Sequence, residues 1–406
     1  MGALPPQVHP FVNEKEGRPI ISASSDPLGL RRTDATPAAT VIAAEIRRGG
    51  PMNFHRFMEL ALYDPEVGYY ARATAGPGPQ RDYMTSPELH GAFGGMLCTE
   101  FEQMWRLLGE PDPFWVVEGG PGNGTMAADV LTYAQGALPR FYAALRMALI
   151  ETNPALQQRQ QARLAAWKDQ VTWLDAAPES WPVLGDGCVV ANELLDVFPI
   201  HLLVGTENGI QECFIEIENE GFVVTTGSPT SEALAEQIQA GGGSLEVGCY
   251  GEVSLEAPRW VGQTAQLIER GYVLIIDYGE PSDILYSAKH RLGTLRCYRA
   301  QVLVEDPLAL PGQQDITEHV DLSAIVHEAE ARGLAMLGAT RQGLFLARLG
   351  IGDIIDRIDT GLSTRTDQQT HRAALDLMMD TGGLGRLAVL LFGKNVPDQL
   401  PAGFGD

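Results

Sequence analysis

Apolar residues recur every three or four positions over the first part of the chain. In "PAATVIAAEIRRGG", Val41, Ala44 and Ile46 fall on one helical face, and a glycine pair follows. The same spacing continues through "FHRFMELALY" and returns in "LHGAFGGMLCTEFEQMWRLLG". The pattern therefore predicts helices over 37–63 and 89–109, separated by a loop rich in glycine and proline.

The centre of the chain alternates short apolar runs with helical segments. The runs "FWVVEGG", "RMALIETNP", "CVVAN" and "GYVLIIDYGE" predict buried strands, and "TMAADVLTYAQG" and "ALQQRQQARLAAW" predict helices between them. This alternation is typical of an α/β protein with a Rossmann-like, doubly wound parallel sheet. Over about 200–258 the chain instead alternates polar and apolar residues around an Asn-Glu-Gly turn, which predicts an antiparallel β insertion.

Towards the end of the chain, "DLSAIVHEAEARG" predicts a helix and "QGLFLARLGI" a strand, and the last 55 residues suggest helices. We expect an irregular arm over 1–35, a helical lid region over 36–113, a Rossmann-like domain over 114–350 that contains the insertion, and C-terminal helices over 351–406.

Composition narrows the possible partners. The 406 residues carry a formal net charge of −23 and no long Lys/Arg cluster, which argues against nucleic acid and suits a cationic substrate, or simply good solubility. No apolar run approaches the roughly 20 residues of a membrane helix. Five scattered cysteines form no CxxC pair, so we expect no metal site and a reducing compartment. The first 35 residues resemble neither a signal nor a transit peptide, and we therefore expect a cytoplasmic protein.

The stretch "VVEGGPGNGT" places four glycines within six residues, directly after a predicted strand and before a predicted helix. Such a turn binds nucleotide-like ligands at the carboxyl end of the sheet. Glu118 precedes the glycines, and its carboxylate would repel a dinucleotide pyrophosphate. It favours S-adenosylmethionine, which carries an ammonium and a sulfonium, over a nicotinamide cofactor. The alternative is that Glu118 only interacts with the helix dipole and that the glycines form a purely structural turn.

Two further strands are predicted to end in polar residues. Glu151 closes the next strand, where an acid accepts hydrogen bonds from ribose hydroxyls. Asn192, Glu193 and Asp196 follow "CVVAN", at the crevice where a substrate nucleophile would arrive. A guanidinium arrives charged, so carboxylates must hold it in a fork, and Glu193 and Asp196 are the first candidates. The alternative is that one of them only caps a helix.

Other candidates have structural alternatives of similar weight. Asp277 follows "VLII" and would project into the same crevice, or would cap a loop. His319 in "DITEHVD" could relay a proton, although a loop that leads into the following helix explains the motif slightly better. Ser86 and Glu88 in "TSPE" could form a helix start alone.

Several motifs together resemble one family. "DYMTSPELHGAFG", "VVEGGPGNGTMAADVL", "IETNPALQQRQ", "ANELLDVFPIH", "GTLRCYRAQ" and "DITEHVDLS" are similar to the MidA family of class I methyltransferases. The resemblance implies S-adenosylmethionine as cofactor, with the "TSPE" loop lying over it. It also implies an arginine-bearing protein substrate of the kind found among the subunits of respiratory complex I, while the oligomeric state stays open.

Together, the residues and the resemblance predict a catalytic set and a cofactor-binding set. The catalytic set is Glu193, Asp196, Asp277 and His319, and the cofactor-binding set is Thr85, Ser86, Glu88, Glu118, Gly120, Gly122, Gly124, Thr125, Glu151 and Asn192. Two positions depart from the family: Gly119 replaces an apolar residue, and Arg81 replaces a glycine. A glycine at 119 loosens the loop, which favours an alternative function as an assembly chaperone with weak or vestigial methyl transfer.

Overall fold

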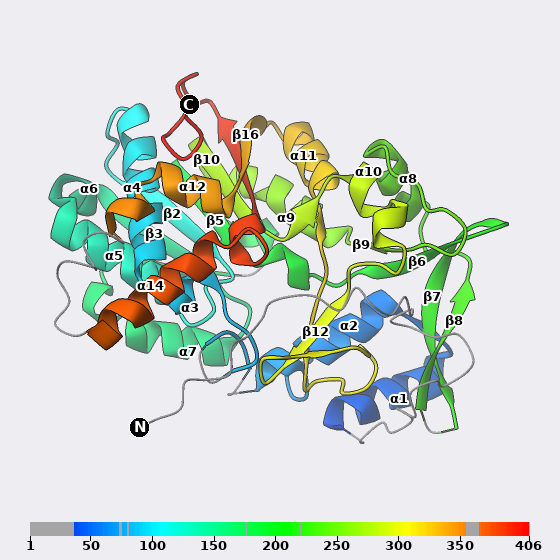
Figure 1. The fold of residues 1–406 in the computed structure, drawn as a ribbon. Helices are drawn as coiled ribbons and strands as arrows, with labels where there is room; N and C mark the ends of the chain where they lie inside the picture. Colours follow the sequence, from blue (N-terminus) through cyan, green and yellow to red (C-terminus); the bar gives the residue numbers. More distant parts are fainter. Residues whose placement is uncertain are drawn as a thin grey trace.

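The computed structural model describes residues 36–72, 75–78, 81–175, 177–219, 221–354 and 365–405. The expected arm over 1–35 therefore lies outside the described residues. Figure 1 shows a central sheet with helices on both faces and a second, strongly bent sheet beside it. No helix in the described ranges combines the length and the apolar character that crossing a membrane requires.

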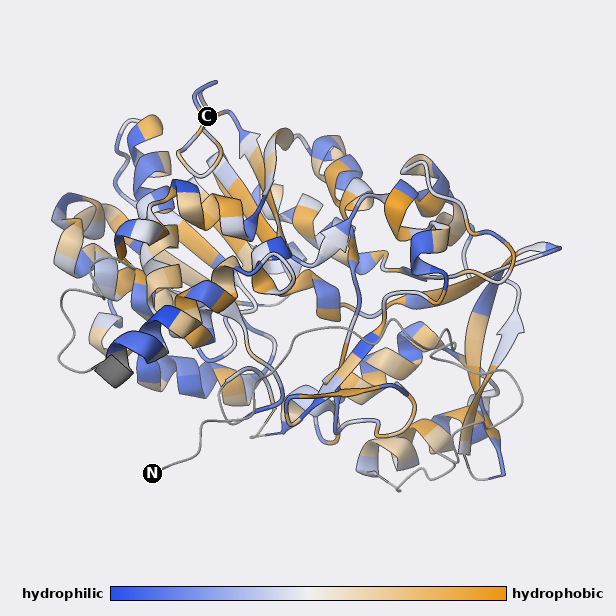
Figure 2. Ribbon diagram, in the orientation of Figure 1, coloured by the Kyte–Doolittle hydropathy of each residue, from blue (hydrophilic) through white to orange (hydrophobic). Residues whose placement is uncertain are grey.

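The central sheet has seven strands in the order β16-β17-β10-β5-β2-β3-β4. They are β2 (Phe114–Gly119), β3 (Leu145–Ile150), β4 (Val171–Leu174), β5 (Gly185–Asn192), β10 (Ile268–Asp277), β16 (Ala335–Arg341) and β17 (Ala388–Lys394). Neighbours from β4 to β10 pair in parallel, and β17 runs antiparallel to both β10 and β16. The strands in the middle are the most hydrophobic (Figure 2), because helices cover both of their faces.

Two helical layers enclose this sheet. Val116 of β2 packs into one layer and Val117 into the other, as the alternation of side chains along a strand requires. The first layer is formed by α4 (Ala92–Leu107), α5 (Thr125–Ala137), α12 (Gln342–Arg348) and α14 (Arg365–Met379), and the second by α9 (Glu256–Gln263) and α11 (Leu322–Ala331). This arrangement confirms the predicted Rossmann-like α/β class.

The predicted antiparallel insertion forms the second sheet, which has five strands. It contains β1 (Met52–Asn53), β6 (His201–Thr206), β7 (Gly209–Glu218), β8 (Gly221–Gly227) and β9 (Tyr250–Val253). The predicted N-terminal helices α1 (Pro37–Gly49) and α2 (Phe54–Tyr63) share a hydrophobic core with it, in which Ile42 and Phe57 are fully buried.

Shorter elements complete the fold. They are α3 (Ser86–Leu89), α6 (Pro139–Ala144), α7 (Pro154–Arg163), α8 (Ala233–Ala240), α10 (Ser282–Leu285), β11 (Gly279–Glu280), β12 (Arg296–Arg299), β13 (Val302–Val304), β14 (Asp315–Thr317) and β15 (Val320–Asp321). Single 3-10 turns include η1 (Tyr69–Ala71), η4 (Leu195–Val197) and η6 (Ala288–His290). Several of these pieces carry the polar residues of the site.

Two predicted elements have the wrong type. The stretch "QGLFLARLGI" begins with helix α12 rather than a strand, and Leu344 on its outer face is 51% exposed. The stretch "AVLLFGK" is strand β17 rather than part of the expected C-terminal helices. Because β17 lies between two strands and under two helical layers, all its residues up to Gly393 are buried, and an apolar run of that kind has no period that separates strand from helix.

Candidate active site

The glycine loop joins β2 to α5 with the geometry that the sequence predicts. Gly120, Gly122 and Gly124 have φ values of 63°, 52° and 72°, in the left-handed region that favours glycine. The Gly124 N–H donates to the Pro121 carbonyl at 2.7 Å, and helix α5 starts at the next residue. The backbone amides at the start of α5 are therefore placed at the carboxyl end of the sheet.

A buried glutamine holds this loop against the end of β3. Gln160 on α7 is fully buried, and its Nε2 donates to the Gly122 carbonyl and to Glu151 Oε2, both at 2.9 Å. Its Oε1 accepts from the Trp173 indole at 3.0 Å. Sequence reasoning missed Gln160. It connects the glycine loop to the predicted ribose-binding acid and fixes the position of both.

Glu118 lies under the glycine loop with one oxygen free for a ligand. The side chain is buried, and its Oε2 has no hydrogen-bond partner among the described residues. Burial, and next to it the charge of Glu151, raise the pKa of Glu118 to about 8. On the neighbouring strand β5, the Asn192 Oδ1 is likewise buried without a described partner. Two orphaned acceptors at adjacent strand ends fit a ligand that carries a cationic donor.

The "TSPE" segment covers the loop and the end of β5. Glu88 Oε1 accepts from the Thr125 hydroxyl at 2.7 Å and from Asn123 Nδ2 at 3.0 Å, so this acid holds the start of α5. The Ser86 backbone N–H donates to Glu193 Oε1 at 3.2 Å. Thr85 is the N-cap residue of α3, but its side chain makes no capping hydrogen bond. The segment therefore links the glycine loop to Glu193.

Ser86 is itself held by a residue that the sequence did not identify. Gln342 at the start of α12 is fully buried, and its Nε2 donates to the Ser86 hydroxyl at 2.9 Å and to the Met378 carbonyl at 3.2 Å. The C-terminal part of the fold thereby positions the segment over the crevice.

Glu193 sits in a backbone conformation that is uncommon outside glycine. Its φ is 50°, its N–H donates to the Ile276 carbonyl at 2.8 Å, and its Oε1 accepts from Ser86 and from Asn192 Nδ2. Backbone strain of this kind concentrates at functional sites. Asp277 supports the turn, because its two oxygens accept the N–H groups of Leu194, Leu195 and Tyr278 at 2.7–3.1 Å. These contacts correspond to the capping interpretation of Asp277.

The acids at this end of the sheet repel one another. Burial, with Asp277 also contributing, raises the pKa of Glu193 to about 8, and burial raises that of Asp277 to about 7. Burial, Asp277 and Glu193 raise the pKa of Asp196 well above its usual value. Asp196 Oδ1 is buried and has no partner among the described residues. These acids therefore hold their protons more readily than ordinary carboxyl groups, and a cation beside them would favour their charged form.

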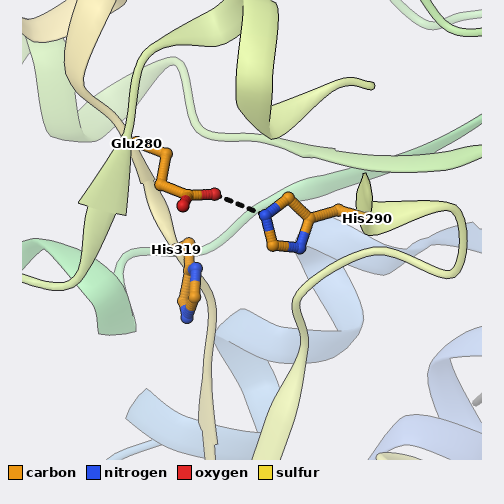
Figure 3. Close-up of side chains that lie close together, drawn as sticks. All are labelled: Glu280, His290 and His319. Atoms are coloured by element: carbon orange, nitrogen blue, oxygen red, sulfur yellow. Dashed lines mark hydrogen bonds and ion pairs between the residues drawn. The ribbon is translucent and has the colours of Figure 1, made fainter. Parts of the chain in front are cut away.

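His319 belongs to a separate polar group, shown in Figure 3 with Glu280 and His290. Its ring stacks on Tyr278 with centroids 6.2 Å apart, and its Nε2 lies 3.2 Å from the Arg386 guanidinium. Burial, then Arg386 and His290, lower the pKa of His319 to about 3, so the imidazole is neutral at physiological pH. Within the described part of the chain, its side chain contacts Tyr278, His290 and Arg386 but not the carboxylates of Glu193, Asp196 or Asp277.

The same three side chains offer potential metal-ligand atoms within 4.8 Å of one another. One Glu280 oxygen already accepts from Lys289 Nζ at 2.5 Å, and the other pairs with His290 Nε2. With Lys289 at one end and Arg386 at the other, a divalent ion would meet two positive charges. The contacts favour a hydrogen-bonded cluster that orients His319 and Tyr278.

The fold and this crevice define the class of the protein. The strand order, with its single antiparallel strand, the glycine loop after β2 and the acid after β3 are those of a class I methyltransferase. Residues 96–340, more than half of the chain, match the family model described as "Putative S-adenosyl-L-methionine-dependent methyltransferase". The chain belongs to this family, which confirms the MidA resemblance and the predicted cofactor.

The curated relatives extend the match over most of the chain. One is the Drosophila melanogaster "Protein arginine methyltransferase NDUFAF7 homolog, mitochondrial", at 30% identity over 86% of this chain and 82% of its own. Another is the Homo sapiens "Protein arginine methyltransferase NDUFAF7, mitochondrial", at 27% identity over 78% of this chain and 74% of its own. The expected cytoplasmic location is contradicted, since these relatives are named as mitochondrial proteins. Scattered reduced cysteines do not distinguish one reducing compartment from another.

A solved structure agrees with the fold throughout. A superfamily member from Burkholderia thailandensis, described as a "likely methyl transferase" and bound to S-adenosyl-homocysteine, is 30% identical and superposes with a TM-score of 0.79. The alignment covers 94% of this chain and 97% of that chain.

Proposed function

We propose that this methyltransferase acts on an arginine side chain of a partner protein. The observation that carries the proposal is the group of buried acids after β5, above all Glu193 and Asp196. Burial, and after it the charge of Asp277, raise the pKa values of both. The relatives named protein arginine methyltransferases support it.

The cofactor side of the crevice is assigned on the same grounds. Glu118 and Asn192 would hold the charged amino-acid end of S-adenosylmethionine, and Glu151 would bind its ribose. The loop from Gly120 to Gly124 would let the backbone come close to the cofactor between these two ends. The cofactor supplies an electrophilic methyl group bound to a sulfonium.

On the acceptor side, the guanidinium gains a methyl group and must lose a proton. Glu193 is suited to take that proton, because its pKa of about 8 lies near physiological pH. Asp277 holds the turn on which Glu193 sits, and His319, whose described contacts lie elsewhere, would act at a distance through Tyr278. The MidA resemblance suggests a complex I type subunit as the partner.

A transfer assay tests the proposal. The purified protein is incubated with S-adenosylmethionine and peptides that differ only in arginine or lysine at one position, and methylation is read by mass spectrometry. Methylation of arginine alone is expected, with loss of roughly 100-fold or more in Glu193→Gln. Glu269→Gln, an exposed residue at the opposite end of β10 from Asp277, is the control and should keep full activity. Methylation confined to lysine would overturn the assignment.

A further inference from the structure

A second buried carboxylate lies close to Asp196, on a different element. Asp315 on β14 is fully buried, and its Oδ1 accepts from the Tyr70 hydroxyl at 3.0 Å, while its Oδ2 has no hydrogen-bond partner among the described residues. Strand β14 packs against η4, which carries Asp196, and the Glu318 N–H following β14 donates to the Asp196 carbonyl at 3.0 Å. Two acids from two elements thus each keep one unpaired oxygen.

Tyrosine rings lie beside this pair. Tyr63 stacks on Tyr70 with centroids 5.4 Å apart and planes at 29°, and the Tyr63 hydroxyl donates to the carbonyl of Val197, the residue after Asp196. Tyr63 remains 36% exposed, so its ring is not enclosed by the stack. Burial and the Asp315 charge raise the pKa of Tyr70 well above its usual value, which places that phenol next to the acid.

We propose that Asp315 and Asp196, together with the Tyr63–Tyr70 ring pair, bind the side chain of the methyl acceptor and select a planar guanidinium. This rests on the proposed function and adds the residues that determine specificity. A guanidinium offers N–H groups along two edges and a flat face, so it can meet two carboxylate oxygens and an aromatic ring together. A lysine ammonium has the charge but no plane to stack.

A nearby acid shows that burial alone does not leave a carboxylate oxygen unpaired. Asp82 is also buried and close enough for its charge to act on Asp315, but one of its oxygens accepts from the Tyr69 hydroxyl and the other from the Ala300 N–H, both at 2.8 Å. Both oxygens of Asp82 therefore accept hydrogen bonds that hold η1 to the loop after β12. Asp315 has one hydroxyl donor and capacity for another.

The test compares two peptides on the complex with S-adenosylhomocysteine. One carries arginine and the other citrulline, which has nearly the same shape without the charge, and binding is measured by calorimetry. The wild type should bind the arginine peptide at least tenfold more tightly, and Asp315→Asn should remove about 10- to 100-fold of that affinity. Asparagine keeps an acceptor for Tyr70, so folding should be preserved, and the affinity for S-adenosylhomocysteine should change less than twofold.

The other outcomes of this experiment distinguish the subsite from the proposed function. Equal binding of both peptides to the wild type, or unchanged arginine binding in Asp315→Asn, overturns the subsite even where arginine is methylated. Selective arginine binding without any methyl transfer upholds the subsite and contradicts the proposed function. Tyr63→Leu should weaken binding of the arginine peptide and leave binding of S-adenosylhomocysteine intact. An unchanged affinity for the arginine peptide in that variant would remove the ring pair from the proposal.

Discussion

The Trp260 indole lies so close to Gly119 that a β carbon on the glycine would fall 2.6 Å from two ring carbons. Trp260 is buried among Trp181, Phe198 and the end of β2. The space that an apolar residue at 119 would occupy is therefore filled by Trp260. This packing argues against a loop that is loosened by Gly119, which is the feature on which the chaperone alternative rests.

Gly119→Ala should lower the free energy of unfolding by about 1–3 kcal/mol, because the new methyl group collides with a buried ring that has little room to move. Gly136→Ala is the matched control, since nothing lies within 4 Å of its β position and it sits inside helix α5. That control should be neutral or slightly stabilising. Denaturant unfolding of both variants decides the matter, and equal stability of the two would contradict the packing argument.

Glu118 should make stability depend on pH. Its pKa is raised from an ordinary carboxyl value to about 8, so the folded state retains a proton that the unfolded state has lost. The contribution to stability is present in full below about pH 4.5 and is lost as the pH rises towards 8. As the pH rises from 5 to 8, the wild type should therefore lose stability relative to Glu118→Gln, so the unfolding free energy of the variant minus that of the wild type should increase.

The same carboxyl group should release a proton when a cationic ligand binds. If Glu118 receives the ammonium of S-adenosylhomocysteine, ionisation becomes favourable near pH 7, and the heat of binding should differ between buffers of different ionisation enthalpy. Glu118→Gln should bind more weakly and show a smaller buffer dependence. If the variant released as many protons on binding as the wild type, the charge of the ligand would lie away from Glu118.

Asp277→Asn should destabilise the protein by about 1–3 kcal/mol, because one amide cannot accept from the three N–H groups that the carboxylate serves. It should also lower kcat, since the turn that holds Glu193 loses its support. Asp315→Asn is the matched comparison and should cost far less stability, because Asp315 has an unpaired oxygen. Thermal unfolding of the two variants side by side gives the answer, and equal losses would refute this difference in roles.

Local signals predicted the parts of the fold and site that lie close together in sequence. The strand, the glycine loop, the following helix and the acids at the ends of β2 and β3 each have a short signature, and the structure has them in those places. The types of α12 and β17 are the reverse of the prediction. Strand β17 is buried on both faces, which removes its period, and in α12 the exposed Leu344 lies between buried residues, so the apolar run does not show the helical period.

The supporting residues had no comparable signal. Gln160 lies 38 positions from Gly122, and Gln342 lies 256 positions from Ser86. A glutamine on a short amphipathic helix is usually solvated, so its type alone does not mark it as buried. Only the folded contacts identify such residues.

Gln160→Leu should reduce the affinity for S-adenosylhomocysteine roughly tenfold or more. Leucine fills a similar volume but leaves the Gly122 carbonyl, Glu151 Oε2 and the Trp173 indole without their partner, so the loop and the ribose-binding acid are no longer held together. Gln158→Leu, on the exposed face of the same helix, is the control and should bind like the wild type. Calorimetric titration measures both, and equal affinities in the two variants would show that the loop keeps its geometry without the glutamine.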